Sequence, residues 1–216
     1  MLQPIRAQVL AVRVIPNVDA ALAAKLELKP HQRSLGILTT TIDDVGYTAF
    51  DEATKQAEVE VVYARSFYAG AAHASGPLSG ECIGILAGPT PDEVKSGLAA
   101  ACRTIEQNAY FEAIVPDGSH ALYAHVVART GSYLSQTAGI PEGEPLAYLI
   151  APPLESIYGL DAALKAADVQ LVQFFGPPSE TNFGGGLLTG TQAACRAAAD
   201  AFRDTICRLA QNPIVY

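Results

Sequence analysis

Apolar and polar residues recur along this chain with two periods, which predict short strands and amphipathic helices. Residues 58–63 and 82–86 are short and rich in β-branched side chains, as is typical of half-buried antiparallel strands. Over residues 90–108 the apolar positions fall three or four apart, which predicts a helix with one face on a sheet. Thr90 fits the cap of that helix, and Glu93 is placed to close a capping box.

The same order of elements occurs twice in the chain. Residues 51–63 and 161–173 both read as a short helix that runs into a strand, with an aspartate and a lysine at matching places. Each copy then reaches a long alanine-rich helix, which ends at residues 107–108 in the first copy and 211–212 in the second. The spacing between the copies shortens along the chain, because loops tolerate changes in length and packed elements do not. We therefore predict an internal duplication.

Each copy is predicted to contain a strand, helix, strand, helix, strand, loop, strand and long helix. About 100 residues per copy fits one layer of helices on one sheet, so the predicted fold class is α/β, an α+β sandwich repeated in tandem. A turn signal at residues 116–118 separates the copies. We expect a first domain at residues 1–115 and a second at residues 116–216.

The composition and charge of the chain limit which kinds of molecule it is expected to bind. Of the 216 residues, 50% are hydrophobic and 17% are charged, with a net charge of −8. Such a chain has too little basic charge to hold phosphate backbones, so nucleic acid is not expected as a partner, and the low charge favours an oligomer. No apolar run approaches the roughly 20 residues that cross a bilayer, and no leader pattern is evident, so we expect no membrane partner and a cytoplasmic location. The four cysteines lack C-x-x-C spacing and are expected to be inert.

Several long motifs of unusual composition are spread over residues 5–213. They are Asp51-Glu-Ala-Thr-Lys-Gln-Ala57, Tyr68-Ala-Gly-Ala-Ala-His73, Arg129-Thr-Gly-Ser-Tyr-Leu-Ser135, Tyr148-Leu-Ile-Ala-Pro-Pro-Leu154 and Pro177-Pro-Ser-Glu-Thr-Asn182. Together they resemble the trimeric tandem-domain shell proteins of ethanolamine-utilisation bacterial microcompartments. The resemblance implies two circularly permuted, ferredoxin-like shell domains, with other shell proteins as partners. It also implies a homotrimer that imitates a hexamer, since each chain brings two domains.

In that family, a loop after the central strand of each domain lines the three-fold axis and opens or closes a central pore. The resemblance places these loops at residues 67–76 and 176–186. Their glycines allow backbone angles barred to other residues, and their aromatic side chains are able to plug an opening. The implied gating residues are Phe67, Tyr68, Gly70, His73, Gly76, Phe175, Gly176, Glu180, Thr181, Asn182, Phe183, Gly184 and Gly185. The alternative is a pair of ordinary flexible hairpin loops.

The resemblance further implies that ethanolamine binds at a minor pore within the subunit and favours closure of the gate. Asp43 and Glu81 match acidic positions of the family, and Tyr110 and Phe111 add an aromatic segment. A primary ammonium with a hydroxyl tail needs a carboxylate for its charge and further acceptors for its remaining donors. The alternative for both acids is the common role of solvated turn residues.

An enzyme is not expected. His73 and Cys82 would suggest a base and a nucleophile, but no third orienting group is evident and the usual catalytic motifs are absent from the sequence. No catalytic cofactor is therefore expected. His73 is a candidate metal ligand if three copies meet on a three-fold axis, although we favour a solvent-facing histidine.

Two other interpretations stay open at this point. Phe67, Tyr68 and Phe183 are candidates to stack on a corrinoid such as cobalamin, during binding or passage at the pore, but we prefer that they seal the gate. The alternative function is a soluble trimeric small-molecule sensor or regulatory binding protein. Such a sensor would stay a discrete trimer, whereas a shell protein would form sheets.

Overall fold

The computed structural model describes residues 2–68 and 76–214, and these form two compact units. The N-terminal unit comprises Arg6–Ala109 and Gly131–Leu134, and the C-terminal unit comprises Met1–Ile5, Tyr110–Thr130 and Ser135–Tyr216. Each unit therefore contains residues from both halves of the sequence.

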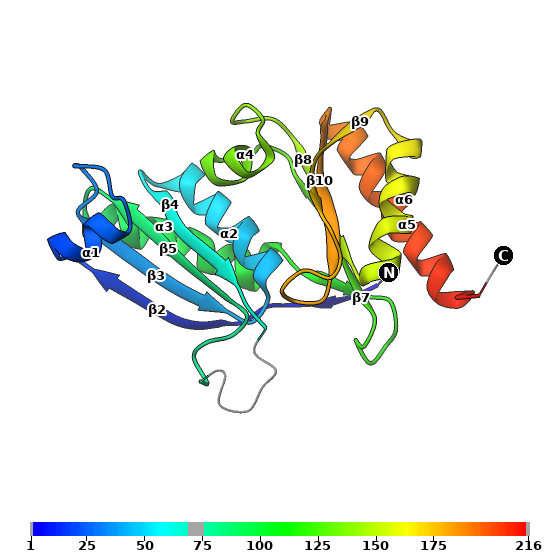
Figure 1. The fold of residues 1–216 in the computed structure, drawn as a ribbon, viewed down its shortest axis with the longest axis horizontal. Coiled ribbons are helices and arrows are strands. Elements are labelled where there is room, and N and C mark those ends of the chain that lie inside the picture. The colour runs from blue at the N-terminus through cyan, green and yellow to red at the C-terminus, as the bar shows by residue number, and fades with distance from the viewer. Residues whose placement is uncertain (1, 69–75, 215–216) are drawn as a thin grey trace. The chain divides into compact units, whose positions relative to one another are not determined.

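The N-terminal unit is built on a four-stranded antiparallel sheet in the order β2-β3-β5-β4. Its strands are β2 (Val9–Ile15), β3 (Ser34–Thr40), β4 (Glu60–Ser66) and β5 (Cys82–Gly88). Figure 1 shows α2 (Asp43–Gln56) and α3 (Pro91–Arg103) against this sheet. A π-helical turn, η1 (Thr104–Asn108), continues α3, and the short α1 (Ala20–Lys25) joins β2 to β3 without burying any residue.

Helix α3 begins where its sequence predicts. The Thr90 Oγ1 accepts a hydrogen bond from the Glu93 N–H at 3.3 Å, which satisfies one of the unpaired donors of the first turn. The Glu93 carboxylate accepts from the Glu58 N–H at 2.8 Å, so it ties α3 to the turn before β4 rather than closing the expected capping box. The predicted apolar stripe is buried at Val94, Leu98, Ala101 and Ile105.

The C-terminal unit repeats this architecture within a larger sheet. Its antiparallel order is β1-β6-β7-β8-β10-β9. The strands are β1 (Gln3–Ile5), β6 (Phe111–Ala113), β7 (Ala121–Val127), β8 (Leu146–Ala151), β9 (Val169–Phe175) and β10 (Gly184–Gly190). Helices α5 (Pro153–Ala166) and α6 (Gln192–Gln211) lie against it (Figure 1), and α4 (Ser132–Ala138) joins β7 to β8. The order β7-β8-β10-β9 matches β2-β3-β5-β4, which confirms the predicted duplication and fold class.

The limits of the compact units differ from the expected division at residues 115 and 116. Strand β1 pairs with β6, from Gln3 opposite Ala113 to Ile5 opposite Phe111. Both strands precede residue 116, yet both belong to the C-terminal unit. The difference arises because each strand has only three residues, which is too short for its sequence to reveal which sheet it extends.

Small residues let the helices of the C-terminal unit approach closely. Phe202 of α6 is fully buried in the core, and it lies over Gly159 of α5. A Cβ atom at position 159 would lie 2.7 Å from the Cδ2 of Phe202, which is closer than packed atoms come. The inward face of α5 is therefore fixed against α6, which leaves the other face of α5 outward.

Candidate functional site

Acidic side chains gather where α2 begins. Asp43 and Asp44 form its first turn, and both are buried. The partial positive charge at the start of a helix favours carboxylates in this position. The Asp43 Oδ1 also accepts a hydrogen bond from the Asp44 N–H at 2.9 Å.

Glu81 is held beside this turn by its backbone. Its N–H donates to the Thr40 carbonyl at 3.0 Å, three residues before α2 starts. Gly80 has φ of +64°, and any Cβ there would collide with the Thr40 carbonyl, so glycine is required at this close approach. Asp43 and Glu81 thereby lie close enough for their charges to interact, while their role in binding a ligand stays a prediction.

The surroundings of the Glu81 carboxyl group disfavour its negative charge. Burial raises the pKa of Glu81, and the charge of Asp43 raises it further. Burial also raises the pKa of Cys82, with added effects from Asp43 and Asp44. A thiol of this kind stays protonated at neutral pH and is a poor nucleophile, which agrees with an inert Cys82. Clustered, partly dehydrated carboxyl groups favour a cation that brings hydrogen-bond donors.

Two tyrosines line the same region, and neither is among the site residues expected from the sequence. The rings of Tyr47 and Tyr133 lie with centroids 6.1 Å apart, and burial raises the pKa of both phenols. Asp43 raises the pKa of Tyr47 as well, and a hydrogen bond with Ser66 opposes this. The spacing of four residues between Asp43 and Tyr47 on a helix was a usable signal. Tyr133 carried no such signal, because it is far away in the sequence.

Tyr110 and Phe111, the aromatic part of the expected ethanolamine site, belong to the C-terminal unit. There the Phe111 ring stacks on Tyr123 at 5.0 Å and meets Phe183 edge to face at 5.9 Å. We define the aromatic cluster as Phe111, Tyr123, His125, Tyr148, Phe175 and Phe183. Tyr123 lies at its centre and contacts Phe111, His125 and Tyr148, while Phe183 contacts Phe111 and Phe175 contacts Tyr148. The ligand role of Tyr110 and Phe111 stays a prediction.

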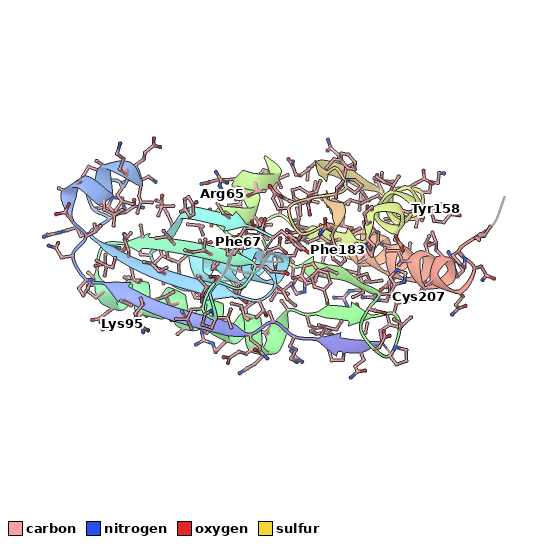
Figure 2. The ribbon with its side chains drawn as sticks, turned by 60° about the horizontal axis from the view of Figure 1, so that its bottom comes forward. Arg65, Phe67, Lys95, Tyr158, Phe183 and Cys207 are labelled. Atoms are coloured by element: carbon pink, nitrogen blue, oxygen red, sulfur yellow. The ribbon has the colours of Figure 1, made fainter. Side chains whose placement is uncertain are left out.

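The first of the two expected pore loops leaves β4 at Phe67, which is labelled in Figure 2. The Phe67 N–H donates to the Glu81 carbonyl at 3.0 Å, so the two ends of the loop are joined at Glu81. Tyr68 follows and is 64% exposed. Gly76 ends the loop in a turn, where its N–H donates to the Ser79 Oγ at 3.0 Å. The expected gating residues Gly70 and His73 lie outside the described residues.

The second expected pore loop forms a compact turn between β9 and β10. The Ser179 N–H donates to the Phe183 carbonyl at 2.7 Å, and the Asn182 N–H donates to the Ser179 carbonyl at 3.0 Å. Asn182 adopts φ of +67°, a conformation that asparagine tolerates better than most residues. Gly176 and Glu180 are exposed in this turn, and Thr181 is half-buried.

Both ends of the second loop belong to the aromatic cluster, through Phe175 and Phe183. Phe183, labelled in Figure 2, contacts Phe111, and Phe175 lies with its ring 6.1 Å from that of Tyr148. The structure places Phe175 at the end of β9, and it places Gly184 and Gly185 inside β10 opposite Ala151 and Ile150. The loop itself is therefore shorter than the expected residues 176–186, because the glycine run continues as a strand.

Within residues 2–68 and 76–214, no group of three or more His, Cys, Asp or Glu side chains is arranged to hold a metal ion. The candidate ligand His73 falls between these ranges. Among the helices of the same described residues, none has the length and apolar character needed to span a bilayer.

Comparison with known proteins assigns the family. A family model described as the BMC domain matches residues 34–117. The bacterial microcompartment shell protein EutL of Clostridium perfringens (strain 13 / Type A) is 60% identical over 210 residues, which cover 97% of both chains. The chain belongs to the EutL family of bacterial microcompartment shell proteins. The EutL-family protein of Escherichia coli (strain K12) is 57% identical, over 97% of this chain and 96% of its own.

A solved structure of the EutL family agrees with the fold described above. The crystal structure of ethanolamine utilization protein EutL from Leptotrichia buccalis C-1013-b matches with a TM-score of 0.96 and 63% identity, over 100% of this chain and 99% of that one. These findings confirm the family predicted from the sequence motifs. The relatives are named as shell proteins and not as enzymes, so the structural shell role is confirmed and the sensor interpretation is set aside.

Proposed function

We propose that the chain forms a homotrimeric, pseudo-hexameric shell tile, with a central pore that the two loops gate for metabolites or cofactors. The sheet orders β2-β3-β5-β4 and β7-β8-β10-β9 support this, because each chain brings two like units. Three chains around a three-fold axis would present six like units. A tile of that kind is able to meet other shell proteins edge to edge.

The proposed regulator is ethanolamine, bound at Asp43 and Glu81. The observation that carries this proposal is that Glu81 takes part in both the acidic site and the first loop. Burial and the charge of Asp43 raise the pKa of its carboxyl group, and its backbone carbonyl accepts a hydrogen bond from the Phe67 N–H. An ethanolammonium ion would replace repulsion between carboxyl groups by charge-assisted hydrogen bonds. A ligand that restrains Glu81 would also restrain Phe67, where the first loop begins.

Regulation of this kind is a shift in populations. Ethanolamine favours the closed pore only if it binds the closed state better than the open state. A tenfold preference corresponds to about 1.4 kcal/mol, which is enough to reverse a nearly balanced gate.

Titration calorimetry with ethanolamine tests the site. Glu81→Gln keeps the shape of the side chain and removes its charge, so we expect at least tenfold weaker binding. Glu142→Gln is the matched control, since Glu142 is exposed and belongs to the C-terminal unit, and its binding should equal that of the unchanged chain. Equal affinity for Glu81→Gln would remove Glu81 from the site.

Negative-stain electron microscopy over a concentration series, beside the solution mass, tests the tile. We expect a trimeric mass and sheets with a hexagonal repeat. Discrete particles at every concentration would oppose edge-to-edge assembly by this chain alone.

The proposal includes no catalytic cofactor. A corrinoid such as cobalamin is a candidate for binding or passage at the pore. Phe175 and Phe183 are already engaged with Tyr148 and Phe111 inside the aromatic cluster, so we assign them to closing the second loop. Tyr68 is the more exposed aromatic residue and is better placed to meet a planar guest.

A further inference from the structure

One contact between a histidine and a carboxylate joins the turn before β7 to the start of α5. The turn of residues 114–120 is closed by a hydrogen bond from the Ile114 N–H to the His120 carbonyl at 2.8 Å. Glu155 is the acidic residue in the first turn of α5. The His120 Nε2 lies 2.9 Å from the Glu155 Oε1, and the two side chains are only 23% and 15% exposed. This contact connects two segments of the C-terminal unit that are distant in the sequence.

The contact is short, but it is not an aligned hydrogen bond. The His120 Nε2 is buried and makes no hydrogen bond of suitable direction with any described residue. A carboxylate oxygen only accepts, so a neutral imidazole with its proton on Nδ1 would bring two lone pairs together at this distance. An imidazolium donates from both nitrogens and adds an opposite charge, which favours a charge-assisted hydrogen bond. Protonation of His120 should therefore strengthen its contact with Glu155.

The other charged side chains of the surrounding elements have partners of their own or face solvent. In the turn, Asp117 accepts two hydrogen bonds from Ser119, and these hold the pKa of its carboxyl group below the usual value. His125 of β7 is stacked on Tyr123 in the aromatic cluster. On β6, α5 and α6 the pairs are Glu112 with Arg203, Asp200 with Arg203, Asp161 with Lys165 and Arg208 with Thr205, while Arg196 and Asp204 are exposed.

The first turn of α5 also lies beside the second loop. Gly184, where this loop returns to β10, is packed so closely that a Cβ would lie 2.7 Å from the Pro177 Cβ and 3.0 Å from the Ser156 Oγ. Ser156 follows Glu155 in α5, and its N–H donates to the Pro152 carbonyl at 2.8 Å. The two ends of the second loop therefore meet beside the turn that contains Glu155.

We infer that His120 and Glu155 form a pH-dependent clasp, which protonation of His120 tightens and which restrains the first turn of α5 beside the second loop. Histidine is the side chain that ordinarily changes its charge near neutral pH, so the clasp responds to modest acidification. Its effect on the pore rests on the proposed gating function. A tighter clasp should favour the conformation of the second loop described above.

Hydrogen exchange at about pH 6 and about pH 8, corrected for the intrinsic effect of pH on exchange, tests the clasp. In the unchanged chain, the N–H groups of Ser156, Ser179 and Asn182 should exchange about fivefold more slowly at the lower pH, because a charge-assisted contact then restrains the turn. The control His31→Gln should keep this difference, since His31 is exposed and belongs to the N-terminal unit.

Two variants remove the pH response from opposite sides of the contact. His120→Gln keeps a donor that does not titrate, and Glu155→Gln keeps an acceptor without its charge, so each should abolish the difference between the two pH values. The test therefore stands if one of the two variants fails to fold, which circular dichroism would show.

The inference is overturned if exchange in the unchanged chain has no such pH dependence, or if His120→Gln keeps it. A dependence that disappears only in His125→Gln would assign the effect to the aromatic cluster and would also overturn the clasp. These measurements concern the C-terminal unit alone. A chain that forms no trimer would contradict the proposed tile and leave the clasp in place.

Discussion

Asp51 is a buried carboxylate whose partners come from both sequence repeats. It accepts the N–H groups of Gly131 and Leu134, and Lys55 lies 3.4 Å from one of its oxygens. Burial raises the pKa of Asp51, although these three donors pull it down. One side chain thus fixes a segment that is about 80 residues away in the sequence.

Asp51→Ala should therefore destabilise the protein strongly. Two buried N–H groups would lose their acceptor and Lys55 would lose its partner, which should lower the free energy of unfolding by about 3 kcal/mol. Urea denaturation measures this loss. The control Asp168→Ala alters an exposed aspartate and should stay within about 0.5 kcal/mol of the unchanged chain. A similar small change for both variants would show that the contacts of Asp51 with Gly131, Leu134 and Lys55 contribute little to stability.

Glu81 predicts a dependence of stability on pH. Its pKa in the folded state lies above the ordinary value of 4.5, chiefly because of burial. The folded state therefore loses stability relative to the unfolded state as the pH rises from the ordinary value through the raised one. The side chain of Glu81→Gln cannot ionise. In the absence of ligand, the Tm of this variant should therefore rise relative to the Tm of the unchanged chain as the pH increases over this interval. Thermal melts from about pH 4 to about pH 8 measure this, and parallel curves would contradict it.

At the scale of elements, the second loop depends on a few aromatic contacts. Phe183 holds the end of the turn through its edge-to-face contact with Phe111, so Phe183→Ala should loosen residues 176–183. Hydrogen exchange should then become at least tenfold faster at the N–H groups of Ser179 and Asn182. Phe174→Ala is the control, because Phe174 is half-exposed on β9 and outside the aromatic cluster, and it should leave this exchange unchanged. Equal exchange in both variants would show that the backbone hydrogen bonds alone hold the loop.

At the scale of the whole molecule, the exposed apolar side chains of α5, which are Leu154, Ile157, Tyr158 and Leu164, predict a stability that depends on association in the proposed homotrimer. Binding between copies stabilises the folded state by mass action, so Tm should rise with protein concentration. Tyr158→Glu should abolish this rise, and Tyr158→Phe should keep it. Scanning calorimetry over a hundredfold range of concentration measures both. A Tm independent of concentration in a chain of trimeric mass would mean that the subunits separate only after unfolding.

Much of the fold was predictable from the sequence, because its signals are local. The cap at Thr90, the stripe from Val94 to Ile105 and the paired segments 51–63 and 161–173 each depend on residues a few positions apart. The candidate site was less predictable from the sequence. Only a family resemblance indicates Asp43 and Glu81, and their proximity arises from a backbone hydrogen bond between Glu81 and Thr40 that no local pattern encodes.

The sequence by itself determined the duplication, the type and order of the elements in each copy, and the shell-protein family, since periodicity and motifs are written in consecutive residues. Only the tertiary structure decided that β1 joins β6, that the glycine run becomes a strand, and that Gly131–Leu134 covers α2. These depend on pairing and burial between distant residues, where the free energy comes from contacts that form only after the chain has folded. The open face of α5 belongs to the same class, because exposure is a property of the packed molecule and not of the residue.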